Sequence, residues 1–128
     1  MIVSELRGRR VLVVEDELLV AMMLEELLRK AGCVVLGPIP RVEMAVPAAR
    51  EEAIDIALLD VNLAGERVYP VAEALIERDV PFVFMTGYGR EGLAEEYADR
   101  PAIAKPFKTA AVLDLLHAVL DRAPSAVG

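Results

Sequence analysis

The sequence predicts an α/β fold, in which helices cover both faces of a single doubly wound, five-stranded parallel sheet. Short apolar runs without polar alternation recur along the chain, a pattern typical of parallel strands buried on both faces. Segments with helical apolar spacing separate these runs, and helices supply the crossovers that parallel neighbours need. The length of 128 residues, with 55% hydrophobic residues, is sufficient for one such core.

Five apolar runs are the predicted strands, and polar residues follow most of them. The first run ends on Glu15 and Asp16, the third on Asp60, the fourth on Thr86, and the fifth and weakest on Lys105. For five βα units the flavodoxin-like strand order 2-1-3-4-5 is the common choice, and we predict it here. The runs cover residues 11–14, 34–36, 56–59, 82–85 and 101–104.

Five helices are predicted to connect and follow these strands. The first, third and fifth carry clear apolar stripes, within residues 20–31, 68–76 and 112–120. The second follows Pro40 and contains Pro47, which either kinks the helix or marks its first turn. The fourth, at about residues 90–98, contains Gly92 and has few apolar anchors beyond Leu93 and Tyr97, so we expect it to be short.

Composition predicts one domain over residues 1–128, with a core at about 9–122 and a tail at 123–128. The net charge of −7 disfavours binding to nucleic acid, because phosphate backbones are also negative. No apolar stretch approaches the roughly 18 residues that cross a bilayer, and no signal peptide is evident. We therefore expect a cytoplasmic protein without a membrane partner. The single cysteine, Cys33, starts an apolar run and is expected to be a buried structural thiol.

The polar residues at the strand ends are predicted to form one pocket. Ligands of open α/β sheets bind at the carboxyl ends of the strands, and strand three lies between strands one and four in the predicted order. Three carboxylates in one pocket repel one another unless a cation lies between them. Hard oxygen ligands suit Mg²⁺, which keeps coordination positions open for phosphate oxygens.

These residue types together indicate phosphoryl chemistry. Asp60 is the best nucleophile candidate, because it is the central carboxylate and a carboxylate can attack phosphorus to form an acyl phosphate. Mg²⁺ and the Lys105 ammonium would neutralise the charge, and the Thr86 hydroxyl could hydrogen-bond a phosphoryl oxygen. Each residue alone has an ordinary explanation as a turn or loop residue. The combination is what points to a site.

Four motifs carry a resemblance to a known family over about residues 9–122. The motifs are Val-Val-Glu-Asp-Glu at 13–17, Leu-Leu-Asp-Val-Asn-Leu at 58–63, Met-Thr-Gly at 85–87 and Lys-Pro-Phe at 105–107. With them the chain resembles the receiver domain of response regulators in bacterial two-component systems. By this resemblance Asp60 is the phosphoacceptor. The side chains of Asp16 and Asp60 and the backbone carbonyl of Asn62 would bind Mg²⁺, for which Mn²⁺ can substitute, and Glu15 would act through water.

The resemblance also implies partners and a switching mechanism. Thr86 would be the switch hydroxyl and Lys105 the partner of the phosphoryl group. A sensor histidine kinase would donate the phosphoryl group from a phosphohistidine. A target protein or a phosphotransfer protein would bind the face formed by the fourth helix, the fifth strand and the fifth helix. Such a chain is a signalling switch with slow self-dephosphorylation rather than an enzyme.

Two departures from the family pattern concern the switch. Ala102 stands where an aromatic residue is expected three places before Lys105, and Ala64 stands where a proline is usual. The stretch at 84–89 partly resembles the Phe-Ala-Thr-Gly-hydrophobic-Tyr motif of the FAT-GUY subgroup, whose members tend to pair with histidine kinases of the HWE/HisKA2 type. Tyr88, between two glycines, is therefore a candidate replacement for the missing switch aromatic, or a residue that packs on the fourth helix.

Two other functions stay open at this point. Enzymes of the haloacid dehalogenase type also use an aspartate nucleophile with Thr or Ser, Lys and Mg²⁺, but their nucleophile lies in an Asp-x-Asp pair after the first strand. Here the candidate follows the third strand, and Asn62 takes the second acidic position. A receiver fold that only binds metal or protein, without phosphorylation, is the other alternative.

Overall fold

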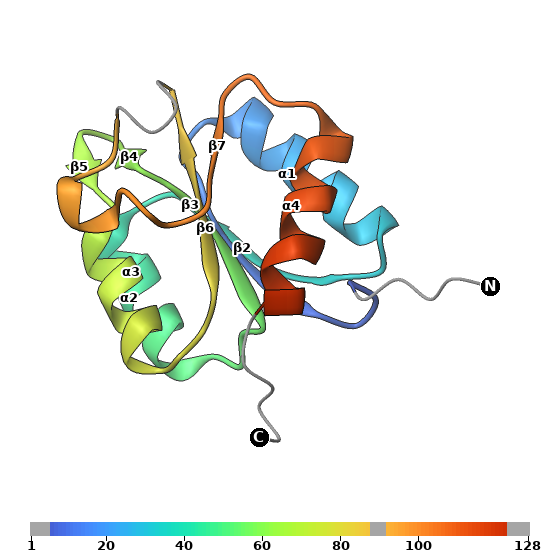
Figure 1. Ribbon diagram of the computed structural model, residues 1–128, viewed down its shortest axis with the longest axis horizontal. Helices are drawn as coiled ribbons and strands as arrows, with labels where there is room; N and C mark the ends of the chain where they lie inside the picture. The colour runs from blue at the N-terminus through green and yellow to red at the C-terminus, as the bar shows by residue number, and fades with distance from the viewer. Residues whose placement is uncertain (1–5, 88–91, 123–128) are drawn as a thin grey trace.

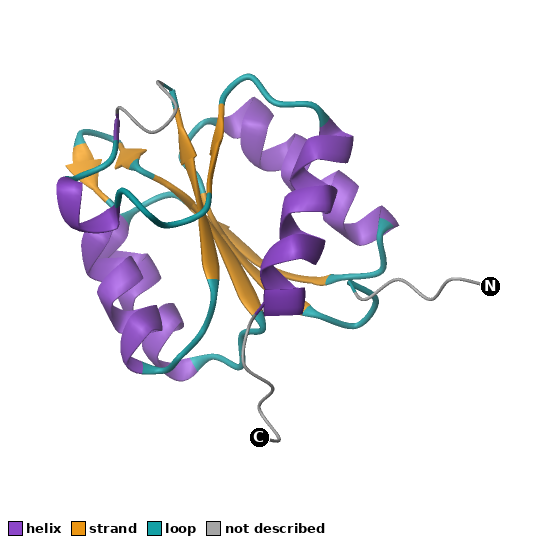
Figure 2. Ribbon diagram, in the orientation of Figure 1, coloured by secondary structure: helices purple, strands orange, loops and turns teal. Residues whose placement is uncertain are grey.

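The computed structural model describes residues 6–87 and 92–122, and these residues form a central parallel sheet between two layers of helices (Figures 1 and 2). The strand order is β2-β1-β3-β6-β7, and every neighbouring pair is parallel. Because β6 and β7 are the fourth and fifth strands of this sheet, the predicted order 2-1-3-4-5 is confirmed. The strands are β1 (Arg10–Val14), β2 (Val34–Ile39), β3 (Ile56–Asp60), β6 (Phe82–Thr86) and β7 (Ala102–Ala104).

Helices cover both faces of the sheet. On one face lie α1 (Leu18–Lys30) and α4 (Thr109–Arg122), and on the other lie α2 (Val42–Glu51) and α3 (Tyr69–Glu77) (Figure 1). Pro47 lies inside α2 rather than in its first turn. No helix within residues 6–87 and 92–122 is long and apolar enough to cross a membrane.

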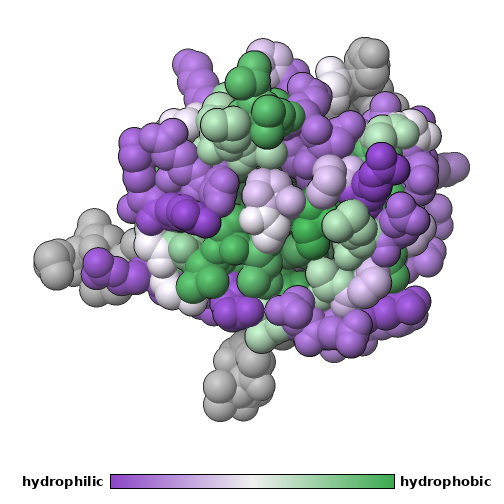
Figure 3. Space-filling view, turned by 180° about the vertical axis from the view of Figure 1, so that it is seen from behind, coloured by the Kyte–Doolittle hydropathy of each residue, from purple (hydrophilic) through white to green (hydrophobic). Residues whose placement is uncertain are grey.

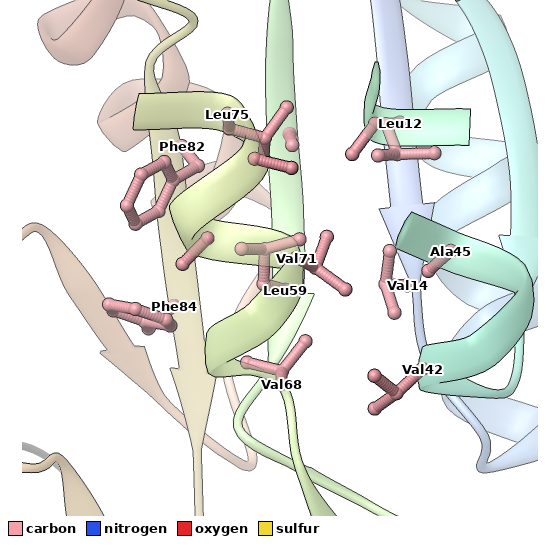
Figure 4. Close-up of a cluster of buried hydrophobic side chains, with 14 of the residues drawn as sticks. Leu12, Val14, Val42, Ala45, Leu59, Val68, Val71, Leu75, Phe82 and Phe84 are labelled. Atoms are coloured by element: carbon pink, nitrogen blue, oxygen red, sulfur yellow. The ribbon is translucent and has the colours of Figure 1, made fainter. Parts of the chain in front are cut away.

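The sheet separates two hydrophobic clusters, which explains why the strand sequences lack polar alternation. Successive residues of a strand point to opposite faces. Leu12 and Val14 therefore pack with α2 and α3, whereas Val11 and Val13 pack toward α1 and α4. Figure 4 shows the first cluster, where Leu59 of β3 lies against side chains of α3. Truncating such a side chain, as in Leu59→Ala, costs roughly 2–5 kcal/mol of stability.

The described residues between β6 and β7 do not form the fourth helix that was predicted there. Between β6 and β7, the described residues form the 3₁₀ helix η2 (Glu95–Tyr97) and no α-helix, and the start of the predicted helix falls in residues 88–91, outside the described part. The described chain therefore has four α-helices, where five helices were predicted. The physical reason is the scarcity of apolar anchors, since within the described part of this segment only Tyr97 is buried.

A short hairpin follows β3 and was not predicted. Its strands β4 (Asn62–Leu63) and β5 (Glu66–Arg67) are antiparallel. Between them Ala64 has φ 50° and Gly65 has φ 89°, as in the two-residue hairpin turns that need positive φ at both positions. Because the hairpin starts two residues after Asp60, it places its residues beside the carboxyl edge of the sheet.

A bulge in β2 positions the loop that carries the first acidic residues. The pairing of β1 with β2 shifts by one residue at Gly37, which has φ 101°. A Cβ at this position would lie 2.7 Å from the carbonyl oxygen of Val13, so only glycine fits there. Beyond the bulge, the backbone N–H of Glu15 donates to the carbonyl of Ile39 at 3.0 Å.

Cys33 is buried, as predicted. Its thiol donates to the carbonyl of Leu6 at a distance of 3.4 Å, and burial raises the pKa of the thiol. A neutral, buried thiol is an inert packing group.

Some large apolar side chains remain exposed. Figure 3 shows apolar surface on the side of the molecule that lies behind the view of Figure 1. On α1, Leu18, Leu19 and Met22 are exposed by 71%, 82% and 55%. Leu18 directly follows Glu17, which lines the pocket described next, so this apolar surface adjoins the pocket.

Candidate functional site

The structure brings together the polar residues that end the strands. Asp60 ends β3 and Thr86 ends β6, its neighbour in the sheet, while Lys105 follows the edge strand β7. They line one pocket of about 530 Å³ at the carboxyl edge of the sheet, at the upper end of the strands in Figure 1. This is the size of a small-ligand site. Asn62, the first residue of β4, lines the same pocket.

Three carboxylates form a cluster at this edge. Glu15 and Asp60 are 1% and 6% exposed, and Asp16 is exposed. Each offers one oxygen, and these oxygens lie within 4.8 Å of one another. Backbone donors orient two of the side chains, because the N–H of Ala64 donates to Asp16 Oδ2 and that of Glu17 to Glu15 Oε2, each at 3.0 Å.

Lys105 is the cation of this cluster. Its Nζ lies 2.7 Å from Glu15 Oε1, 3.3 Å from Asp60 Oδ2 and 3.4 Å from Glu17 Oε1. Burial alone would lower the pKa of Lys105, but the bond to Glu15 and the charges of the three carboxylates outweigh burial and raise this pKa. The side chain therefore stays protonated while it faces more negative charge than it can neutralise.

The pKa of Asp60, the nucleophile candidate, is strongly raised. Burial, followed by the hydrogen bond and the charge of Glu15, raises the pKa of Asp60 to about 8, against the opposing effect of Lys105. The ionised carboxylate is thus disfavoured unless further positive charge is present. The donor set of Glu15, Asp16 and Asp60 fits a hard divalent cation such as Mg²⁺, which would supply that charge.

Thr86 ends β6, lines the pocket and is 2% exposed. Its backbone carbonyl accepts a hydrogen bond of 2.7 Å from the N–H of Lys105, which extends the β6–β7 pairing by one step. This bond fixes the separation of the two residues. Tyr88 lies outside the described residues, so the hypothesis that it replaces the missing switch aromatic stays a prediction. Ala102 is half-buried on β7.

Two pocket residues, Arg67 and Tyr69, were not predicted as part of the site. Tyr69 stacks on Tyr97, with ring centroids 4.6 Å apart. Its hydroxyl oxygen also accepts a hydrogen bond of 2.7 Å from the N–H of Ala94. Arg67 Nη1 donates to the carbonyl of Gly92 at 3.4 Å. The only sequence signal for these residues is the Ala-Gly turn that precedes them.

Comparison with known proteins places the chain among receiver domains. The family model described as the response regulator receiver domain matches residues 11–118. The transcriptional regulatory protein PdtaR of Mycobacterium tuberculosis is 31% identical over 112 residues, which are 87% of this chain and 55% of PdtaR. The chain thus spans about half the length of this curated relative.

Solved structures agree with this comparison. The solution structure of SdrG from Sphingomonas melonis Fr1 has a TM-score of 0.78 and 41% identity, over 91% of this chain and 98% of SdrG. The receiver domain of the sensor histidine kinase PA1611 from Pseudomonas aeruginosa PAO1 has a TM-score of 0.75 and 25% identity, over 89% of this chain and 98% of that one. Its structure holds a magnesium ion coordinated in the active site cleft. The strand order, the acidic cluster beside a lysine and the match over most of the sequence lead to one conclusion: the chain belongs to the response regulator receiver domain family.

Proposed function

We propose that this receiver domain accepts a phosphoryl group on Asp60 from a phosphohistidine of a sensor histidine kinase. One observation carries the proposal: the Asp60 carboxylate is 6% exposed, lines the pocket, and lies 3.3 Å from the Lys105 ammonium beside two further carboxylates. This arrangement provides a nucleophile, a cation for the phosphoryl oxygens and ligands for a metal. The domain is a signalling switch, so the phosphorylated state is its product rather than an intermediate of steady turnover.

Mg²⁺ is the proposed cofactor, and Mn²⁺ can substitute for it. Asp16 and Asp60 would hold it through their side chains, Asn62 through its backbone carbonyl and Glu15 through water. A bound divalent cation neutralises the carboxylates and the phosphoryl oxygens, and so permits attack of one anion on another. Burial, followed by the hydrogen bond and the charge of Glu15, raises the pKa of Asp60, which supports a requirement for such a charge.

The remaining chemistry belongs to the residues of the chain. A carboxylate oxygen of Asp60 attacks phosphorus, the new O–P bond forms as the N–P bond of the phosphohistidine breaks, and the histidine nitrogen keeps the electron pair. The Lys105 ammonium contacts one phosphoryl oxygen and the Thr86 hydroxyl donates to another. In slow self-dephosphorylation, water attacks phosphorus, the O–P bond breaks, and the Asp60 carboxylate and inorganic phosphate are released.

The proposed partners are proteins. The exposed apolar residues Leu18, Leu19 and Met22 adjoin the pocket, and contiguous exposed apolar surface is typical of protein interaction sites. The kinase is proposed to be of the HWE/HisKA2 type, from the partial FAT-GUY motif at 84–89. A target or phosphotransfer protein would bind the face made by the η2 segment, β7 and α4. Among the similar proteins is the anti-anti-sigma factor PhyR of Bartonella quintana, a mutant of which has a known crystal structure.

The test is intact-mass analysis after incubation with acetyl phosphate, with and without Mg²⁺. We expect one hydroxylamine-labile phosphoryl adduct that requires Mg²⁺ and is absent from the Asp60→Asn variant. If acetyl phosphate gives no adduct, a phosphorylated histidine kinase replaces it as donor. An adduct that persists in Asp60→Asn, or none with either donor, would contradict the proposal, and the second result would favour a binding module.

A further inference from the structure

We propose that Arg67 is a second cationic residue of the phosphoryl pocket, which contacts the phosphoryl group of the donor and of the Asp60 adduct. This inference rests on the proposed function, because it concerns the same pocket. Arg67 comes from the β4–β5 hairpin, whereas Lys105 directly follows β7, and both residues line the pocket.

The shared pocket and the weak contacts of Arg67 leave its guanidinium able to reach a phosphoryl group at Asp60. Arg67 and Asp60 both line the same pocket of about 530 Å³. Within residues 6–87 and 92–122, the one hydrogen bond that holds its guanidinium goes to the carbonyl of Gly92. That bond is exposed, is 3.4 Å long and has a neutral acceptor. A weak bond of this kind leaves the guanidinium available for a stronger acceptor.

The negative charge of the pocket favours a second cationic residue beside Lys105. Lys105 already lies within 3.4 Å of Glu15, Glu17 and Asp60. A phosphoryl group brings two or three anionic oxygens into this cluster. Lys105, which also pairs with carboxylates, contacts one of them, and the Thr86 hydroxyl is neutral, so a second cationic side chain adds charge that these two residues do not supply. No carboxylate of the described residues forms an ion pair with Arg67.

The chemistry of arginine fits this role. The guanidinium is always charged, and its planar set of donors matches two oxygens of a phosphoryl group. Charge-assisted bonds to such oxygens are stronger than a bond to a neutral carbonyl. Arg67 therefore exchanges the Gly92 carbonyl for the phosphoryl group.

The experiment compares three variants with the wild type. Arg67→Gln removes the charge, and Arg67→Lys keeps it. Arg50→Gln is the matched control, because Arg50 is an exposed arginine near the C-terminal end of α2 and does not line the pocket. Two quantities are measured with saturating Mg²⁺: the rate of phosphorylation by acetyl phosphate, and the dissociation constant of beryllofluoride from amide chemical shifts.

We expect Arg67→Gln to slow phosphorylation and weaken beryllofluoride binding by at least about fivefold, the effect of one partly exposed charge-assisted contact. Arg67→Lys should recover most of both losses, and Arg50→Gln should match the wild type. If Arg67 only supports the Gly92 carbonyl, both Arg67 variants lower thermal stability and beryllofluoride affinity stays within twofold of the wild type. That result, or a lysine variant as impaired as the glutamine variant, overturns the inference.

The design separates this inference from the proposed function. A wild type that gains no adduct and binds no beryllofluoride contradicts phosphorylation itself. Equal behaviour of wild type and Arg67→Gln, with phosphorylation intact, contradicts only the role of Arg67.

Discussion

Replacing Asp60 by asparagine should stabilise the metal-free protein at neutral pH. In the folded chain the pKa of Asp60 is raised from 3.8 to about 8, first by burial and then by Glu15. In the unfolded chain this carboxyl ionises at about its ordinary pKa. Between these two values the folded state binds more protons, so the contribution of Asp60 to stability is lost progressively as pH rises from about 4 to about 8.

The magnitude follows from the same values. Each pH unit between 3.8 and 7 reduces the free energy of unfolding by about 1.36 kcal/mol, which gives a loss of about 4 kcal/mol at pH 7. Asparagine has nearly the same shape and cannot ionise, so Asp60→Asn avoids this loss. The favourable pairing of Asp60 with Lys105 is already included, because it opposes the rise of the pKa.

Urea denaturation in the presence of EDTA measures this difference. We expect Asp60→Asn to exceed the wild type by about 4 kcal/mol at pH 7, by roughly half of that or less at pH 5, and by almost nothing at pH 4. Saturating Mg²⁺ should stabilise the wild type more than the variant, because ligand binding to the folded state adds to its stability. The control is Asp55→Asn, which removes a partly exposed carboxylate outside the pocket and should show no such gain.

Two results would refute this reasoning. One is a metal-free Asp60→Asn variant that is no more stable than the wild type at pH 7. The other is a gain that stays constant between pH 4 and pH 7, because a difference in packing, unlike a difference in ionisation, does not depend on pH.

Three further perturbations test other parts of the structure. Lys105→Met should slow phosphorylation by acetyl phosphate at least about tenfold, and an unchanged rate would contradict the role of Lys105 as partner of the phosphoryl group. In urea denaturation without metal, the same variant should lose about 2 kcal/mol or more of stability, because it leaves buried carboxylates without their cation. Tyr69→Phe should remove the acceptor for the Ala94 N–H and speed exchange of that amide about fivefold, for a bond worth about 1 kcal/mol, and unaltered exchange would show that the bond is absent in solution. Gly37→Ala should destabilise the fold by about 2 kcal/mol or more, because its φ is 101° and a Cβ would lie 2.7 Å from a carbonyl oxygen of β1. Gly8→Ala is its control, because Gly8 also has positive φ but nothing lies within 4 Å of its Cβ position, so a similar loss there would contradict the steric argument.

The sheet could be predicted from the sequence because burial on both faces leaves a direct pattern. Residues 56–59 are apolar without exception, and every residue of β3 is buried in the structure. The convergence of Asp60, Thr86 and Lys105 follows from the parallel order, since strand ends that are distant in sequence meet at one edge. The proximity of these three residues could therefore be predicted from the strand positions and the strand order alone.

Local features were harder to predict, because they depend on contacts rather than on periodicity. The hairpin after β3 contains Ala64 at positive φ, a conformation that favours glycine, asparagine or aspartate, so the sequence carries only half of the usual turn signal. Arg67 is an ordinary exposed arginine until the hairpin places it at the pocket. The short η2 replaces a full helix because Tyr97, which stacks on Tyr69, is the one fully buried residue of this described segment, whereas Leu93 and Ala94 pack against the core only partly buried.

The backbone bond between Lys105 and Thr86 differs in strength and setting from the other contact described at the pocket, that between Arg67 and Gly92. The 2.7 Å backbone bond continues the β6–β7 pairing, so the two residues cannot separate without opening the edge of the sheet. The contact between the Arg67 side chain and the Gly92 carbonyl is exposed and 3.4 Å long, so it opens more easily. Donors of different size would therefore be accommodated by displacement of the Arg67 side chain, while the spacing of the two groups that meet the phosphoryl oxygens stays constant.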